Sequence, residues 1–385
     1  MRRSYTKRAA RTFGIAFMAT LFGVASQIGA ASAAPSTWSL QPTENRGTMD
    51  ALNAVSCTSS SFCMAVGSFD NSSGVSRTFG EMWNGNAWVK VRTKDVGDAN
   101  NSLNGVSCTS PTDCIAAGFG AGEYMEGIVE KFNGSSWSIA SILSSPKGDY
   151  SLSGVSCKSS TFCQAVGQLR DEAGTFPAIF SLGANGWSVP STFTDGSRGS
   201  SFTGVSCASA TFCVAVGNEP GDPYQEGFTE TFNGSSWSHS SDLSDDHGEY
   251  TFSAVSCKSS TFCEAVGQLG NDGGIFGVAD TWDGSSWSGG SLGFHQTSLT
   301  AVSCTSSTNC VAAGYSFSGK NDKTLVATGS GASWSESSTP DRGRGANSLY
   351  GISCTRSTAC EAVGYFYDAT VSADQTLALR GKPAV

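Results

Sequence analysis

A short segment bounded by two cysteines occurs seven times in this chain and limits the folds that it can adopt. VSCKSSTFCEAVG at 255–267 nearly repeats VSCKSSTFCQAVG at 155–167, and every copy holds two cysteines with five residues between them. Recurrence about every 50 residues indicates an array of equivalent units that pack against their neighbours. The pairs are Cys57 and Cys63, Cys108 and Cys114, Cys157 and Cys163, Cys207 and Cys213, Cys257 and Cys263, Cys304 and Cys310, and Cys354 and Cys360.

Each unit predicts four β-strands. In the third unit, residues 152–157 and 163–169 form the first two strands. In other units the third strand ends in an Asn-Gly or Asp-Gly step, which is followed by an aligned tryptophan. Such steps favour type I′ hairpin turns, because both central residues need positive φ. Four antiparallel strands repeated seven times predict an all-β, seven-bladed β-propeller rather than a parallel β-helix, whose coils are much shorter. The units start near residues 51, 102, 151, 201, 251, 298 and 348.

The two ends of the chain predict how the ring of blades closes. The last unit stops at QTLALRGKPAV, before its fourth strand and its tryptophan. The missing phrase occurs at the other end of the chain, as STWSLQP with Trp38. We therefore expect residues 35–42 to supply the outer strand of the last blade, which leaves no open sheet edge at the seam.

The cysteine pairs predict one disulfide per blade. An antiparallel hairpin places the two cysteines of a pair opposite each other, within disulfide reach, and an extracellular location favours oxidation. Free core cysteines and a metal site are the alternatives, but seven identical pairs and three histidines fit neither. We expect seven bridges within hairpins, none between blades, and no metal site.

Residues 1–33 predict a secretory signal peptide. MRRSYTKRAAR is basic, an apolar stretch follows, and Ala31-Ser32-Ala33 is an A-x-A cleavage pattern. A membrane anchor is the alternative, but the apolar run is short. RRSYTK resembles a twin-arginine signal, although the general secretory route suits a cystine-rich chain better. We expect a monomer outside the cytoplasm, in the extracellular or periplasmic and cell-wall space, with residues 34–385 as a single propeller domain.

Charge excludes one class of partner. Cleavage would remove five basic and no acidic residues, and 18 Lys and Arg would remain against 32 Asp and Glu. An acidic protein repels phosphate backbones and anionic membrane surfaces. We expect no nucleic-acid partner and no membrane insertion after cleavage.

The third-to-fourth strand turn carries a family resemblance. TWDGSSW at 281–287 and TFNGSSW at 231–237 resemble the Asp-box, or BNR repeat, of sialidase-like propellers, although the spacing to tryptophan is one residue shorter and Asn replaces Asp in most copies. The period and the use of tryptophan are similar to the kelch repeat. The resemblance, to secreted bacterial propellers, implies the fold. It implies no ligand, because propellers host many functions.

Motifs for catalysis or cofactor binding are not evident. A sialidase-like enzyme needs an arginine cluster and a Tyr/Glu pair, but none of the nine arginines after the leader lies in a recognisable motif. The acidic run at 244–250 lacks the regular spacing of a calcium loop, so a solvated surface is the simpler interpretation. We expect no cofactor. A column of acids at equivalent third-strand positions is explained more simply by solvent exposure or inter-blade hydrogen bonds than by catalysis: Glu81, Glu130, Glu230 and Asp280.

Loop variation gives the functional hypothesis. The first-to-second and third-to-fourth connections are nearly uniform and share one face, whereas the other connections vary and share the opposite face, where binding residues usually lie. We expect a non-catalytic protein that binds carbohydrate or a protein partner there, the alternative being an extracellular sialidase-like, glycan-cleaving enzyme. The candidate contacts are Tyr124, Asp171, Glu172, Asp222, Tyr224, Asp246, His247, Arg342, Arg344 and Tyr367.

Overall fold

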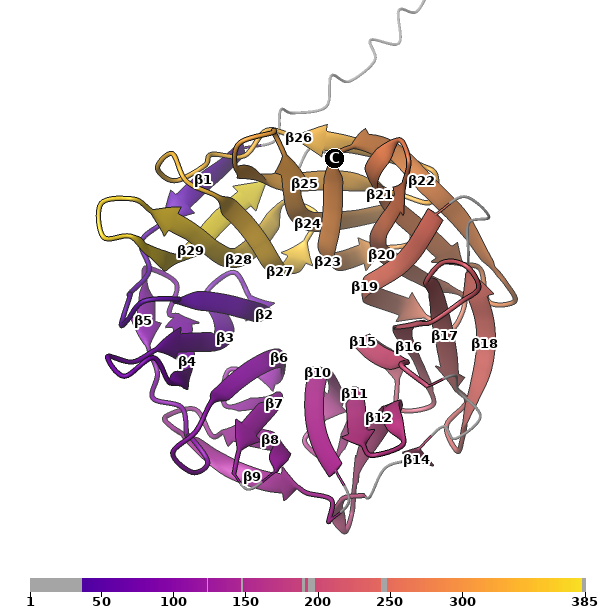
Figure 1. The fold of residues 1–385 in the computed structure, drawn as a ribbon, viewed down its shortest axis with the longest axis horizontal. Coiled ribbons are helices and arrows are strands. Elements are labelled where there is room, and N and C mark those ends of the chain that lie inside the picture. Colours follow the sequence, from indigo (N-terminus) through magenta and orange to yellow (C-terminus); the bar gives the residue numbers. More distant parts are fainter. Residues whose placement is uncertain are drawn as a thin grey trace, which may run out of the picture. The chain divides into compact units, whose positions relative to one another are not determined.

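The computed structural model describes residues 37–122, 124–146, 148–188, 191–192, 198–243 and 248–382. Seven antiparallel sheets follow one another around a central axis (Figure 1). This arrangement confirms the seven-bladed propeller expected from the repeats. The predicted signal peptide lies outside the described residues. Within the described ranges, no helix is long and apolar enough to cross a membrane.

Blades 1 to 4 each begin with the strand nearest the axis. Blade 1 is β2 (Ala51–Ser59), β3 (Phe62–Asp70), β4 (Ser76–Trp83) and β5 (Trp88–Lys90), and blade 2 is β6 (Asn101–Ser110), β7 (Asp113–Ala121), β8 (Met125–Phe132) and β9 (Trp137–Leu143). Blade 3 is β10 (Gly148–Ser159), β11 (Phe162–Asp171), β12 (Gly174–Gly183) and β13 (Gly186–Trp187), with the short β14 (Ser191–Thr192) also paired to β12. Blade 4 is β15 (Ser201–Ser209), β16 (Phe212–Glu219), β17 (Glu226–Phe232) and β18 (Trp237–Leu243).

Blades 5 to 7 complete the ring. Blade 5 is β19 (Gly248–Ser259), β20 (Phe262–Asn271), β21 (Gly274–Trp282) and β22 (Trp287–His295). Blade 6 is β23 (Thr297–Ser306), β24 (Asn309–Phe317), β25 (Asp322–Ser330) and β26 (Ser333–Ser337). Blade 7 is β27 (Asn347–Arg356), β28 (Ala359–Asp368) and β29 (Ala373–Lys382), with β1 (Thr37–Gln41) as its outer strand.

Strand β1 closes the last blade as the missing tryptophan predicted. It pairs antiparallel with β29, with Trp38 opposite Gly381. The Trp38 side chain is buried in a core cluster that includes Ile352 and Leu379. The first and last parts of the propeller are thus joined in one sheet. Pro35 and Ser36 of the predicted segment lie outside the described residues.

All seven disulfides form within their own hairpins. Each first cysteine is paired in register with the second cysteine of the same blade, as Cys257 is with Cys263. The Cα–Cα distances are 3.9 or 4.0 Å in every bridge, and no described cysteine is free. The expectation of seven bridges and none between blades is confirmed.

The serine before each first cysteine ties its blade to the next. Its Oγ accepts a hydrogen bond of 2.9 or 3.0 Å from the backbone N–H of the following blade's first cysteine. These bonds run from Cys108 to Ser56, Cys157 to Ser107, Cys207 to Ser156, Cys257 to Ser206, Cys304 to Ser256, Cys354 to Ser303 and Cys57 to Ser353. Together they form a closed ring of inter-blade bonds, which explains why the serine repeats along with the cysteine.

Glycine at the end of each AVG or AAG triplet lets the two inner strands pair closely. A Cβ at Gly267 would lie 1.9 Å from the backbone oxygen of Thr251 on the neighbouring strand. Side chains larger than hydrogen are therefore excluded there. The repeated phrase thus supplies a bridge, an inter-blade hydrogen bond and a close strand contact in every blade.

We call these seven inter-blade hydrogen bonds the serine ring. Removing the one between blades 7 and 1 should measurably destabilise the protein. We expect Ser353→Ala to lower the free energy of unfolding by about 1 kcal/mol, because the N–H of Cys57 loses its acceptor. Urea unfolding of the variant and the wild type measures this difference. Ser73→Ala is the matched control, since Ser73 lies exposed in a loop where only its backbone N–H is bonded. Equal losses in both variants would contradict a specific role for the ring.

Candidate binding face

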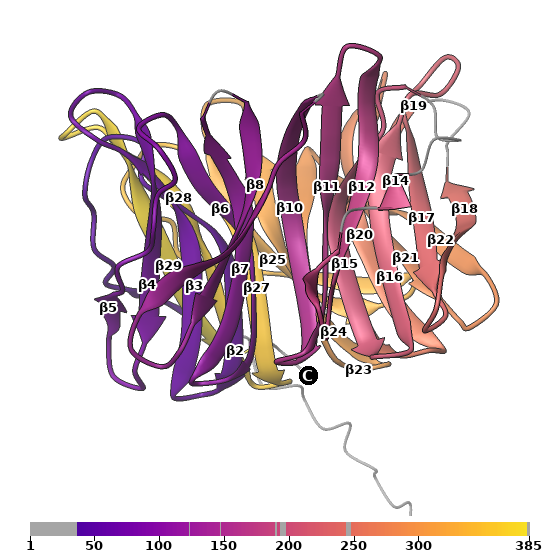
Figure 2. The ribbon, with the colours of Figure 1, turned by 90° about the horizontal axis from the view of Figure 1, so that it is seen from below.

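The two ends of the propeller differ in their connections (Figure 2). We call one end the uniform face, where the turns between the first two strands all contain two residues, as at 60–61 in blade 1. We call the other end the variable face, where the loops between the second and third strands range from two residues in blade 3 to six in blade 4. The inter-blade connections also reach this end. The division expected from loop lengths is therefore present in the structure.

Exposed apolar side chains gather on the variable face. Nine large hydrophobic side chains are exposed among the described residues, and two of them, Leu40 and Ile142, lie on the outermost strands β1 and β9. The others lie in loops of the variable face or at the strand ends beside them: Met49, Tyr124, Tyr224, Ile275, Phe317, Tyr367 and Val371. Exposed apolar side chains concentrated on one surface are typical of interaction sites.

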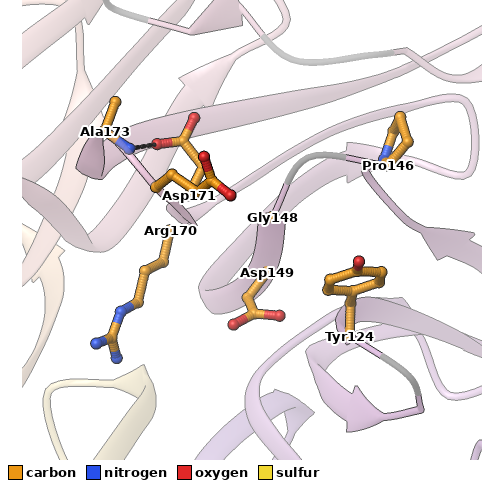
Figure 3. A pocket seen from close by; sticks show the side chains of 8 residues that line it. Tyr124, Pro146, Gly148, Asp149, Arg170, Asp171 and Ala173 are labelled. Atoms are coloured by element: carbon orange, nitrogen blue, oxygen red, sulfur yellow. Dashed lines mark hydrogen bonds between the residues drawn. The ribbon is translucent and has the colours of Figure 1, made fainter.

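A pocket of about 680 Å³ opens on the variable face between blades 2 and 3 (Figure 3). Tyr124 enters it from the β7–β8 loop, Asp171 from the end of β11 and Glu172 from the β11–β12 turn. Three of the predicted contact residues thus line one cavity. Its volume is within the range of ligand sites in proteins.

Two further residues of this pocket were missed by the sequence analysis. Arg170 and Asp149 lie near the ends of β11 and β10, and Figure 3 places Asp149 between Arg170 and Tyr124. Both residues lie outside the strands predicted at 152–157 and 163–169, and neither was chosen as a candidate contact. The signal that could have identified them is their position, one or two residues from a variable loop. Strands β10 and β11 extend to these residues, beyond the predicted strand ends.

Backbone hydrogen bonds hold the carboxylates of this pocket in place. Asp149 Oδ1 accepts from the N–H of Met125 at 2.8 Å, and Asp171 Oδ1 accepts from the N–H of Ala173 at 2.8 Å. Three carboxylates, one guanidinium and one phenol can bond hydroxyl groups, while the tyrosine ring offers an apolar surface. Among the described residues, no group of three His, Cys, Asp or Glu is arranged to hold a metal ion.

The other predicted contacts are distributed around the rim rather than gathered at this pocket. Asp222 and Tyr224 lie in the β16–β17 loop of blade 4, and Tyr367 lies near the end of β28 in blade 7. Arg342 lies in the connection between blades 6 and 7, where its guanidinium packs 4.7 Å from the Phe366 ring centroid. Arg344 lies exposed in the same connection. The predicted Asp246 and His247 lie outside the described residues.

The axial channel is narrow and uncharged. It has a volume of about 190 Å³, and each blade contributes three residues of its innermost strand, such as 53–55 of blade 1. The residues that line it are small, aliphatic, amide or hydroxyl-bearing, with Tyr350 as the largest. The arginine cluster that a sialidase-like enzyme needs is not among these lining residues.

The column of third-strand acids is buried, so the interpretation of these residues as solvent-facing was wrong. Glu130 Oε2 accepts from the backbone N–H of Lys94 at 3.1 Å, and Glu81 Oε1 accepts from the N–H of Glu44 at 2.6 Å. Both donors belong to the connection that arrives from the preceding blade, so the inter-blade alternative holds for Glu81 and Glu130. The partner of Asp280 is Tyr250 of its own blade. The third strand lies between neighbouring blades on both sides, so its alternate residues do not reach water.

Burial changes the proton affinity of these acids. Desolvation raises the pKa of Glu81 to about 7 and that of Glu130 to about 8, against an ordinary value of 4.5. It also raises the pKa of Asp280 to about 6, although the hydroxyl of Tyr250 donates to that carboxylate. Because Glu81, Glu130 and Asp280 are buried between blades, we assign them to the fold rather than to chemistry on a ligand.

These features define a disulfide-bridged seven-bladed β-propeller with one loop-rich face. No family model and no curated protein matches the chain. YCF48 from Cyanidioschyzon merolae is similar in structure, with a TM-score of 0.56 and 15% identity over 91% of this chain and 99% of that one. A structure of YCF48 bound to a D1 peptide has a TM-score of 0.55 and 13% identity over 91% and 96% of the two chains.

A polysaccharide-cleaving enzyme shares the same architecture. An ulvan lyase bound to -[GlcA(1-4)Rha3S]- is similar with a TM-score of 0.55 and 11% identity, over 86% of this chain and 93% of that one. At these identities the likeness shows the fold alone.

Proposed function

We propose that this protein is a secreted, non-catalytic binding protein whose variable face binds a carbohydrate or a protein partner outside the cell. The observation that carries the proposal is the gathering of exposed aromatic and aliphatic side chains on that face, beside a pocket of about 680 Å³. Tyrosine offers a flat apolar ring with a polar tip, which suits sugar rings and protein hot spots alike. Seven disulfides support an oxidising, extracellular location.

The same fold carries both kinds of ligand in other proteins. One solved structure of this architecture is bound to a peptide and another to a saccharide. Non-catalytic binding is favoured here because the acids buried between blades are out of reach of a ligand and the channel lining carries no charge. Of the acids of the pocket between blades 2 and 3, Glu172 is exposed, whereas Asp149 and Asp171 are half-buried and are oriented by backbone hydrogen bonds, which suits them to hold a ligand.

A glycan array tests the proposal with the mature protein and two triple variants. We expect the triple variant Tyr124→Ala, Tyr224→Ala and Tyr367→Ala to lose binding to the glycans that the wild-type protein binds on the array. The variant should keep its fold, because these three side chains are exposed. Ser135→Ala with Ser235→Ala and Ser285→Ala alters the uniform face and should keep both binding and fold.

A protein partner is tested separately by photo-crosslinking on the surface of cells that secrete the protein. A crosslinker at position 124 should capture a partner that a crosslinker at position 135 does not. Loss of binding in the serine variant, or crosslinks from position 135 alone, would place the binding site on the uniform face and contradict the proposal.

A further inference from the structure

A second pocket, of about 400 Å³, lies on blade 1 and is strongly basic. Four of its eight lining residues are cationic, namely Arg46, Arg77, Arg92 and Lys94, and one is acidic. The chain after the predicted leader holds only 18 Lys and Arg against 32 Asp and Glu, so this concentration opposes the overall charge. Arg77 is paired with Phe69 one step before the β3–β4 loop, which places the pocket at the variable-face end of the blade.

The pocket is formed by the ends of β3 and β4 together with two inter-blade connections. Arg46 belongs to the connection that enters blade 1, whereas Arg92 and Lys94 belong to the connection that leaves it. The leaving connection is fixed to β4, because Asp95 Oδ1 accepts from the backbone N–H of Thr78 at 2.8 Å. It is also fixed to blade 2 through the hydrogen bond from the N–H of Lys94 to Glu130.

Uncharged partners hold two of the guanidinium groups. Arg77 donates to the backbone oxygens of Gly97 at 3.3 Å and Asp98 at 3.0 Å. The guanidinium of Arg46 lies 5.5 Å from the Phe69 ring centroid and 5.7 Å from that of Phe79. Carbonyl groups and aromatic rings orient a guanidinium without neutralising it, so its charge stays available to a ligand.

The positive charge of the pocket is only partly offset by neighbouring acids, since Glu44 and Asp50 interact with the charge of Arg46. Arg92 and Lys94 are exposed, and none of the four cations forms an ion pair within the part of the chain that the structure describes. Glu130 lies behind Lys94, but burial raises its pKa to about 8, so it is largely uncharged at neutral pH. Asp95 is the one acid that lines the pocket, and one of its oxygens is already bonded to Thr78.

We propose that this pocket binds the carboxylate or sulfate groups of an acidic polysaccharide. Guanidinium groups form paired, charge-assisted hydrogen bonds with such anions, and four cations from β4 and two connections suit a polymer with repeated charges. An acidic peptide fits less well, because peptide ligands depend on apolar anchors and Phe69, the one apolar residue that lines the pocket, is covered by Arg46. This inference rests on the proposed function, since it names a ligand class for the variable face.

The test uses short oligosaccharides of polygalacturonate and of dextran sulfate, with neutral dextran and oligoglutamate for comparison. Isothermal titration calorimetry should show that the mature protein binds at least one acidic saccharide more tightly than neutral dextran, with affinity falling between about 0.05 M and about 0.5 M salt. Arg92→Glu with Lys94→Glu should weaken that binding about tenfold or more. Lys320→Glu with Lys323→Glu, exposed at the same face of blade 6, makes the same charge change and should leave the affinity within about twofold of the wild type.

Several outcomes would overturn the inference. Equal weakening in both double variants would show attraction by overall charge, and tighter binding of oligoglutamate would assign the pocket to acidic peptides. If the Arg92 and Lys94 variant kept its affinity for the acidic saccharide while the triple tyrosine variant lost it, the basic pocket would not be the binding site. The proposed function would still hold. A melting temperature close to that of the wild type shows that the Arg92→Glu, Lys94→Glu variant folds. If its melting temperature is much lower, the variant Arg92→Gln with Lys94→Gln is used in its place.

Discussion

Replacing Trp38 with alanine is expected to lower the free energy of unfolding by about 3–5 kcal/mol, the usual cost of truncating a buried tryptophan. Trp38 is 9% exposed and packs in a core cluster with residues of blade 7. Among the described residues, strand β1 pairs in the sheet only with β29. Loss of the side chain therefore weakens the strand that completes the last sheet. Guanidinium chloride unfolding, followed by tryptophan fluorescence and circular dichroism, measures the change.

Leu40→Ala is the matched control for this effect. Leu40 lies two residues along the same strand, but it is 37% exposed, so its truncation should cost less than about 1 kcal/mol. A Trp38→Ala protein with the same unfolding midpoint as the wild type would contradict closure by β1. Equal losses in the two variants would show that the strand backbone, rather than the tryptophan, holds the ring together.

Repetition made the fold predictable. Seven cysteine pairs at one period, turn signals before an aligned tryptophan, and Trp38 displaced to the other end of the chain define blades, hairpins and closure. Apart from the displaced Trp38, these signals are local in sequence, because blades 1 to 6 are built from consecutive strands. The serine ring was not predicted, since its bonds join residues of neighbouring blades, as between Ser353 and Cys57.

The candidate sites were less predictable because they depend on where the loops and connections go. Loop variability correctly placed Tyr124, Asp171 and Glu172 on one face, and the structure shows that they share a pocket. The basic pocket carried no motif, since Arg46 and Arg92 come together only through the paths of two connections. Arg342 and Arg344, two of the candidate contacts, lie in the connection between blades 6 and 7, away from both pockets, and Arg342 packs on Phe366.

The buried acids should make stability fall as the pH rises. The pKa of Glu130 is about 8 in the folded protein against an ordinary value of 4.5, so the folded state keeps a proton that the unfolded chain releases. Stability from this proton is complete below pH 4.5 and is lost as the pH rises through about 8. At about 1.4 kcal/mol per pKa unit, the loss amounts to a few kcal/mol. Unfolding by urea between about pH 5 and pH 8 measures it.

Two substitutions separate the titration of Glu130 from its hydrogen bond. Glu130→Gln and Glu130→Leu both remove the titrating group, so the free energy of unfolding should fall less steeply with pH in both than in the wild type. Only glutamine keeps an acceptor for the N–H of Lys94, and the leucine variant should therefore be less stable than the glutamine variant by about 1–3 kcal/mol. Blade 7 carries Leu379 at the equivalent position, opposite Ala362 as Glu130 lies opposite Ala116, so the blade itself tolerates an apolar residue there. If both variants kept the pH dependence of the wild type, Glu130 would not be the group that takes up the proton.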